Sequence, residues 1–168
     1  MNKTIAKFEK VSYKQFFADI KKLFPNTSEE EIELEYQNII LPYRSTVDSA
    51  GYDFTLTRDI TIKSEEMLVI PSGIRAKIDS GFVLEIYPRS SLGIKKNLIL
   101  ANTVGIIDAD YYYATNEGHI LIALWNRGKQ DVTLLKGERV TQGIFKAYYL
   151  AIEEEVTNIR IGGIGSSN

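Results

Sequence analysis

Five short segments of the chain combine residue types that can move a proton or hold an anion. They span residues 50–53, 88–93, 102–111, 137–142 and 160–167. A carboxylate such as that of Asp108 can orient a water molecule and accept its proton. An arginine such as Arg89 can form paired, charge-assisted hydrogen bonds with anionic oxygens. Each segment alone could be a turn or the end of a strand, so the argument depends on all five together.

In this order and at these spacings, the five segments resemble the motifs of the trimeric dUTP pyrophosphatases, or dUTPases, from about residue 39 onward. The resemblance implies hydrolysis of dUTP to dUMP and pyrophosphate by attack of water on the α-phosphate. This reaction limits uracil incorporation into DNA and supplies dUMP for dTMP synthesis. The resemblance also implies Mg2+ as cofactor and a homotrimer with sites at subunit interfaces. Whether a phage, a prophage or a cell encodes the chain stays open.

The third segment carries the expected catalytic centre. Asp108 matches the family aspartate that orients and deprotonates the attacking water. Tyr111 matches the tyrosine whose ring packs under the deoxyribose and leaves no room for a 2'-hydroxyl. Asn102 corresponds to an asparagine that helps to read the uracil edge, since an amide offers both a donor and an acceptor. The resemblance assigns the remaining base reading to backbone groups of Ile106, Ile107, Ile120 and Leu121.

Two further segments match the part of the family site that holds the triphosphate. Arg89, Ser90 and Ser91 match the residues on the α and β phosphates, and Gln142 resembles a glutamine on the phosphate side. Mg2+ usually keeps several waters and takes inner oxygen ligands from phosphates. We therefore expect no direct protein ligand, with Asp53 and Gln142 in the outer shell of the metal.

The C-terminal segment resembles the arm that closes over bound nucleotide, with Arg160 on the γ-phosphate and Gly165 and Ser166 against phosphate oxygens. Ile164 stands where the family usually has a phenylalanine that stacks on uracil. We expect each arm to act on another subunit, because a compact sandwich offers it no obvious way to reach Asp108 of its own chain. The loop 112–117 is longer than the usual tight turn, and it can alter the pocket rim or carry a partner contact.

The elements that must position these residues change character near Pro42. Before it, Ser12 is a candidate N-cap for a helix that ends at Pro25, with apolar residues at helical spacing. Thr27 and Ser28 precede Glu30 and Glu31 as in a capping box, which predicts a second helix with a solvated acidic face. We expect this helical extension to occupy residues 1–38. It can be a subunit contact, a cover for exposed sheet or a docking surface.

After residue 42 the pattern predicts short strands with little room for any helix. The predicted strands are 54–57, 67–71, 82–87, 98–101, 120–125, 132–135 and 140–149. So many short strands favour an antiparallel sandwich or barrel. The resemblance makes this a mainly β, distorted jelly-roll core over residues 39–155, followed by a flexible C-terminal arm over residues 156–168.

Composition excludes several other kinds of protein. A chain of 168 residues with 44% hydrophobic and 25% charged residues suits one globular domain. Without cysteine, disulfides and thiolate chemistry are excluded, and we expect the single histidine, His119, to be an ordinary polar strand residue. A net charge of −2 gives no general attraction to a nucleic-acid backbone, which argues against a polynucleotide substrate. No signal peptide or membrane span is apparent, so we expect a cytoplasmic protein that does not contact a membrane.

Two rival functions remain. A dCTP deaminase shares the expected fold but needs a glutamate where this chain has Ala123, which disfavours deamination. The second rival is a nucleotide-gated regulatory protein that binds a repressor, with or without catalysis, as some viral and mobile-element relatives do. The N-terminal helices and the loop 112–117 suit such a role. A P-loop NTPase is excluded because no G-x-x-x-x-G-K-[ST] motif is present.

Overall fold

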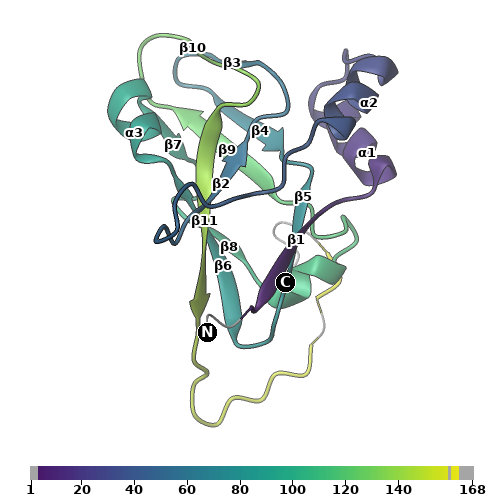
Figure 1. The fold of residues 1–168 in the computed structure, drawn as a ribbon, viewed down its shortest axis with the longest axis vertical. Coiled ribbons are helices and arrows are strands. Elements are labelled where there is room, and N and C mark those ends of the chain that lie inside the picture. Colours follow the sequence, from purple (N-terminus) through teal and green to yellow (C-terminus); the bar gives the residue numbers. More distant parts are fainter. Residues whose placement is uncertain (1–3, 159, 163–168) are drawn as a thin grey trace.

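The computed structural model describes residues 4–158 and 160–162, and it has a mainly antiparallel β-fold with helices near its N-terminus (Figure 1). The fold class predicted from the sequence is confirmed. The helices are α1 (Tyr13–Leu23), α2 (Glu29–Gln37), α3 (Ser90–Lys96) and the 3-10 helix η1 (Ala109–Tyr113). The strands are β1 (Ala6–Lys10), β2 (Tyr52–Thr55), β3 (Ile60–Ile62), β4 (Met67–Pro71), β5 (Ile74–Ile78), β6 (Phe82–Pro88), β7 (Leu98–Leu100), β8 (Gly105–Ile107), β9 (Leu121–Asn126), β10 (Val132–Leu134) and β11 (Arg139–Ala147).

The strands form two larger sheets and two strand pairs. One sheet has the order β2-β11-β6-β8, the other has the order β4-β9-β7, and the remaining pairs are β1-β5 and β10-β3. All of these pairings are antiparallel. In this arrangement β11 lies between β2 and β6, and β8 lies at an edge of its sheet among the described residues. The strands β2, β8 and β11, which carry predicted site residues, therefore lie in one sheet, whereas the predicted Leu121 lies on β9 of the other sheet.

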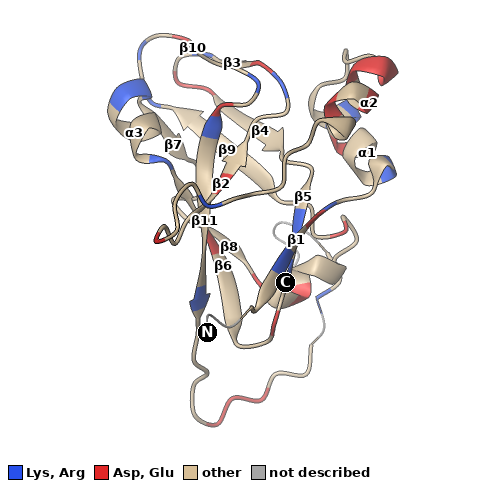
Figure 2. Cartoon of the chain, in the orientation of Figure 1, with Lys and Arg blue, Asp and Glu red and all other residues tan. Residues whose placement is uncertain are grey.

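Local sequence signals account for both N-terminal helices. The Ser12 side chain accepts a hydrogen bond from the backbone N–H of Gln15 and caps α1, as predicted. Ser28 and Glu31 form a complete capping box at the start of α2. The first turn of α2 carries three glutamates, and Figure 2 shows this acidic turn at the outer edge of the molecule. Negative charge there is favoured by the helix dipole.

Other expectations about secondary structure were wrong. The expectation of little helix after residue 42 fails at α3 and η1. Arg89 has extended backbone just before α3, and Asn97 ends that helix in the left-handed conformation. Residues 6–10, which lie in the segment expected to be helical, form β1 and pair with β5. Strands β1 and β5 have only five residues each, in which apolar and charged residues alternate. So short an alternation is a weak signal when the partner strand is not known.

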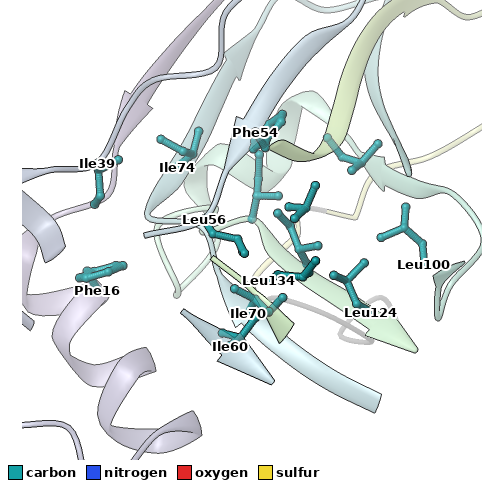
Figure 3. Close-up of a cluster of buried hydrophobic side chains, with 14 of the residues drawn as sticks. Phe16, Ile39, Phe54, Leu56, Ile60, Ile70, Ile74, Leu100, Leu124 and Leu134 are labelled. Atoms are coloured by element: carbon teal, nitrogen blue, oxygen red, sulfur yellow. The ribbon is translucent and has the colours of Figure 1, made fainter. Parts of the chain in front are cut away.

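The N-terminal helices cover part of the β-structure and share its core. Phe16, Ile20 and Ile32 are fully buried and belong to one hydrophobic cluster with residues of the sheets. Figure 3 shows Phe16 projecting from its helix toward Ile39 and the strand side chains. The guanidinium of Arg58 forms two hydrogen bonds with the carboxylate of Glu35 on α2, at 2.6 and 3.1 Å. Of the three roles considered for this segment, covering the sheet is thus observed. The domain boundary at residue 38 stays a prediction.

No helix among the described residues is long and apolar enough to cross a membrane.

The packing of α1 predicts that this helix is required for stability of the whole domain. Phe16→Ala should lower the free energy of unfolding by about 3–5 kcal/mol, because it removes a fully buried ring and leaves a cavity. Leu34→Ala, at a side chain that is 57% exposed, is the matched control and should cost less than about 1 kcal/mol. Urea unfolding followed by circular dichroism measures both. A separate early transition for the helices, with an unchanged main transition, would contradict the prediction.

Candidate functional site

A cavity of about 220 Å³ lies where β6, β7, β8 and β9 meet η1. Seven of the residues predicted to contact substrate line it together: Asn102, Ile106, Ile107, Tyr111, Ile120, Leu121 and Arg160. Its other walls are mostly apolar, and they include Ala123. Apolar walls with a few convergent polar groups are typical of sites for small organic ligands. The structure thus brings together residues that are up to 58 positions apart in the chain.

Strand β8 presents backbone groups to this cavity. It pairs with β6 through Leu84↔Ile107, Glu85↔Ile106 and Ile86↔Gly105. Because β8 is an edge strand among the described residues, the backbone groups on its other side have no strand partner. The side chain of Ile106 is itself exposed, at 56%. Strand β8, whose residues line the cavity, therefore has main-chain donors and acceptors available on its open edge.

Tyr111 is held firmly in the wall of the cavity. Its side chain is buried, and its hydroxyl donates to the carbonyl oxygen of His119 at 2.8 Å. The amide of Asn116 donates to the same hydroxyl, also at 2.8 Å. Burial raises the pKa of Tyr111, so the phenol stays protonated and keeps its role as a donor. A ring fixed in this way gives the cavity one rigid face.

Asp108 lies at the start of η1, at the edge of the same cavity. It occupies the N-cap position, but its side chain makes no capping hydrogen bond and is 47% exposed. Instead, Oδ2 of Asp108 accepts from Nη2 of Arg160 at 2.6 Å, and Nε of Arg160 donates to Oδ1 of Asp110 at 2.9 Å. The carboxylate expected to activate water is therefore accessible and faces a cation.

The position of Arg160 corrects one expectation. The C-terminal arm reaches Asp108 of its own chain, and a hydrogen bond from the N–H of Thr115 to the carbonyl of Ile161 holds it there. Figure 1 shows the arm leaving β11, passing around one end of the molecule and returning to η1. An extended chain covers at most about 3.3–3.6 Å per residue, so the stretch from Ala147 to Arg160 can span roughly 40 Å. Ile164, Gly165 and Ser166 lie outside the described residues.

A second cavity, of about 440 Å³, contains the residues predicted to bind phosphate. Asp53, Arg89, Ser90, Ser91 and Gln142 all line it. The buried carboxylate of Asp53 is the charged centre: its Oδ2 lies 2.9 Å from Nη1 of Arg89 and 3.2 Å from Nη1 of Arg139, and it accepts from the hydroxyl of Ser45 at 2.7 Å. Two guanidinium groups around one carboxylate leave net positive charge beside the two exposed serines.

Strand register explains how the second cavity is assembled. On β11, Gln142 lies opposite Asp53 of β2 and opposite Tyr87 of β6. Arg89 follows β6 directly, and its N–H donates to the carbonyl of Val140. The pairing of β11 with β2 shifts between Arg139 and Thr141, which marks an irregularity of the β-bulge kind next to the site. After the shift Gln142 lines the cavity, and before it Arg139 contacts Asp53, which also lines the cavity.

The two groups of predicted residues line different cavities of the single chain. No described residue lines both, so within that part of the chain the residues beside Asp108 and the residues around Arg89 lie in separate cavities. A larger cavity, of about 690 Å³, lies between the N-terminal helices and residues 57–59. None of the residues that line it was predicted to bind substrate or metal, whereas the two smaller cavities are lined by residues that were.

Several polar contacts of the site were missed by the sequence prediction. Arg139 and Ser45 both bind Asp53, and Asp110 shares Arg160 with Asp108. Arg139 lies within the fourth motif, which is a signal that could have identified it. The expectation for His119 was wrong: it precedes β9, is fully buried, and its ring bonds Asp19 of α1 and the N–H of Gly73. No local pattern indicates these partners.

Metal-binding side chains do not cluster in the described part of the chain: no group of three or more His, Cys, Asp or Glu side chains there could hold a metal ion. Mg2+ prefers oxygen ligands, and the second cavity contains the carboxylate oxygens of Asp53 and the amide oxygen of Gln142. Among the described residues, the side-chain contacts of Asp53 with Ser45, Arg89 and Arg139 all involve Oδ2. The outer-shell role of Asp53 toward Mg2+ stays a prediction.

Comparison with known proteins agrees with this geometry. The dUTPase family model matches residues 37–168. A deoxyuridine 5'-triphosphate nucleotidohydrolase from Lactococcus lactis subsp. lactis is 41% identical over 142 residues, covering 82% of this chain and 95% of that protein. The crystal structure of dUTPase from Streptococcus mutans has a TM-score of 0.66 and 34% identity, covering 86% of this chain and 97% of that chain.

A further solved structure, a variant dUTPase of Staphylococcus bacteriophage 80alpha with dUpNHpp, has a TM-score of 0.67 and covers 94% of this chain and 99% of that chain. Its identity of 17% shows a common fold alone. The family match includes the residues that line both cavities. The chain therefore belongs to the dUTPase family.

Proposed function

We propose that this chain hydrolyses dUTP to dUMP and pyrophosphate, and so limits uracil incorporation into DNA while supplying dUMP. One observation carries the proposal beyond family membership. Six residues expected to contact the nucleoside line a single cavity together with Arg160, and Arg160 bonds Asp108 at its edge. The relatives from Lactococcus and Streptococcus are named for the same substrate or activity.

The shape of the first cavity suits deoxyuridine. Edge strand β8 can read the uracil through its unpaired backbone groups, and the amide of Asn102 adds a donor and an acceptor. The fixed ring of Tyr111 forms the face on which the deoxyribose packs and where a 2'-hydroxyl would collide. The cavity contains Ala123 in place of the glutamate that deamination requires, so hydrolysis is favoured over conversion of dCTP.

In the proposed reaction, Asp108 orients a water molecule and accepts its proton as the water attacks the α-phosphorus. The oxygen Oδ2 of Asp108 is bound to Arg160 in the structure without nucleotide. Phosphate oxygens compete for the same guanidinium, and transfer of Arg160 to the γ-phosphate frees the carboxylate for the water. Arg160 thus has a partner both before and after the nucleotide binds.

The second cavity supplies the phosphate contacts. Arg89 provides charge, and the hydroxyls of Ser90 and Ser91 provide hydrogen bonds. Mg2+, when bound, neutralises charge on the triphosphate. Oδ1 of Asp53 and the amide oxygen of Gln142 have the chemistry to accept hydrogen bonds from its waters, so the donor set fits an outer-shell site.

We further propose a homotrimer in which one subunit provides the first cavity and another provides the second. The separation of the two cavities within one chain supports this assembly. The arm offers a second argument, because apolar side chains such as Tyr149 and Ile152 are more than nine-tenths exposed in the single chain. Burial of such side chains against a neighbouring subunit is favourable. A cytoplasmic location stays a prediction.

A regulatory role with a repressor as partner is the alternative. The phage 80alpha structure belongs to work stating that phage dUTPases control transfer of virulence genes. At 17% identity that resemblance reaches the fold alone. A repressor partner for this chain therefore stays a prediction, and it is compatible with catalysis.

The substrate proposal predicts selective pyrophosphate release. With Mg2+ present, dUTP should be hydrolysed faster than dCTP, dTTP and UTP, because the cavity reads the uracil edge and Tyr111 excludes the 2'-hydroxyl. Chromatography of the products, with a pyrophosphate assay, measures this and also detects deamination. Equal rates on all four nucleotides would refute the selectivity, and binding without turnover would favour the regulatory alternative.

The role of Asp108 predicts that Asp108→Asn lowers turnover of dUTP by roughly 10²- to 10⁴-fold while binding persists, since the amide keeps the shape but cannot accept the proton. Asp110→Asn is the matched control, because it removes the neighbouring carboxylate that also binds Arg160. Single-turnover kinetics and calorimetry with a non-hydrolysable analogue separate the two effects. Turnover of Asp108→Asn within twofold of the parent would assign the base elsewhere.

The composite site predicts complementation between two inactive variants. Equal mixing of Asp108→Asn and Arg89→Gln subunits, after unfolding and refolding together, should recover about one quarter of the intact sites, because each mixed trimer rebuilds one site. Steady-state rates and light scattering measure recovery and assembly. No recovery in demonstrably mixed trimers would mean that each site uses both cavities of one chain.

A further inference from the structure

Helix α1 is bonded directly to the loop that carries Tyr111, although the family match begins only at residue 37. One contact joins Asp19 to His119 and a second joins Ser12 to Glu117. Ser12 and Asp19 are seven positions apart, or about two helical turns, so they lie on the same face of α1. That face therefore points at residues 111–120.

His119 is the centre of the first contact. Its ring is fully buried, Nε2 accepts from the N–H of Gly73 at 2.8 Å, and Nδ1 lies 2.6 Å from Oδ2 of Asp19. Because Nε2 is an acceptor, the proton of the neutral ring is on Nδ1, which donates to Asp19. Burial raises the pKa of Asp19, but the hydrogen bonds from His119 and Gln15 outweigh it and leave this pKa below its usual value.

The backbone of His119 links this contact to Tyr111 in the wall of the first cavity. Its carbonyl oxygen accepts the hydroxyl of Tyr111 at 2.8 Å, and the amide of Asn116 joins the same group. The next residue, Ile120, lines the first cavity. A displacement of His119 would therefore move both the tyrosine ring and one of the backbone readers.

The second contact restrains the same loop from its other end. Both oxygens of the Glu117 carboxylate bind Ser12, one through the backbone N–H at 2.7 Å and one through the hydroxyl at 2.6 Å. Gly118, between Glu117 and His119, has left-handed backbone with a φ of +70°. A side chain there would lie 2.7 Å from the carbonyl oxygen of Tyr111, so the loop packs closely on η1.

We propose that Asp19 of α1 is a positioning residue for substrate selectivity: through His119 it fixes the ring of Tyr111 that discriminates deoxyribose from ribose. The inference rests on the proposed function, because it concerns selectivity for dUTP. It assigns the N-terminal helices a role in the site in addition to covering the sheet.

The test compares three substitutions on α1. Asp19→Ala removes the acceptor for His119. Asp19→Asn keeps an oxygen that can accept from both His119 and Gln15, whose bonds end on the same oxygen of Asp19. Phe17→Ala is the control for stability, because Phe17 packs against the core and its ring contacts Tyr13.

Asp19→Ala should reduce the ratio of kcat/KM for dUTP to that for UTP by roughly three- to tenfold, the equivalent of one hydrogen bond. Its effect on dUTP should fall mainly on KM. Asp19→Asn should stay within about twofold of the parent, and Phe17→Ala should melt earlier with an unchanged ratio. An unchanged ratio in folded Asp19→Ala, or an equal loss in Phe17→Ala, would overturn the proposal. If Asp19→Ala does not fold, Asp19→Ser carries the same test with a side chain too short to reach His119.

Hydrogen–deuterium exchange separates failure of this inference from failure of the proposed function. If the parent protein shows no preference for dUTP, the proposed function has failed. Faster exchange of residues 111–121 in Asp19→Ala, but not in Phe17→Ala, would still support the positioning role. Equal exchange in that segment for the parent and Asp19→Ala would overturn it, whatever the substrate is.

Discussion

The antiparallel pairing of β11 with β2 and β6 is the constraint on which both cavities depend. It sets Gln142 beside Asp53 and places Arg89 at the end of the neighbouring strand. It also fixes β6, on which β8 and its backbone groups are aligned. Gly143 allows this close arrangement, because a side chain there would lie 2.8 Å from Leu84 and 3.1 Å from Phe54. A slip of one residue would turn every side chain of β11 to the opposite face.

Charge is distributed differently in the two cavities. In the second cavity the carboxylate of Asp53 is buried and held by two arginines, so its position is fixed before any phosphate arrives. In the first, Asp108 is half exposed and meets one arginine from the arm. A buried carboxylate is costly without partners, whereas an exposed one can exchange its partner readily. This difference suits a structural role for Asp53 and a reactive role for Asp108.

Much of the fold was predictable because its signals are local. Ser12 and Ser28 cap helices whose apolar residues recur at helical spacing, and both helices form where predicted. The predicted strand 67–71 has the same bounds as β4, because a short, continuous apolar run is bounded there by polar residues before it and by Ser72 and Gly73 after it. Strands β1 and β5 were missed, since each depends on the other for burial and hydrogen bonds. Helix α3 was missed because it is only seven residues long.

The sequence by itself determined the family, the residue types of the site and the caps that begin the N-terminal helices, because motifs and caps are contained in a few adjacent residues. Only the tertiary structure decided that the predicted residues divide between two cavities, that Arg160 meets Asp108 of its own chain, and that His119 is buried against α1. These contacts join positions that are 52 and 100 residues apart. Such pairs depend on strand register and core packing, which no local pattern specifies.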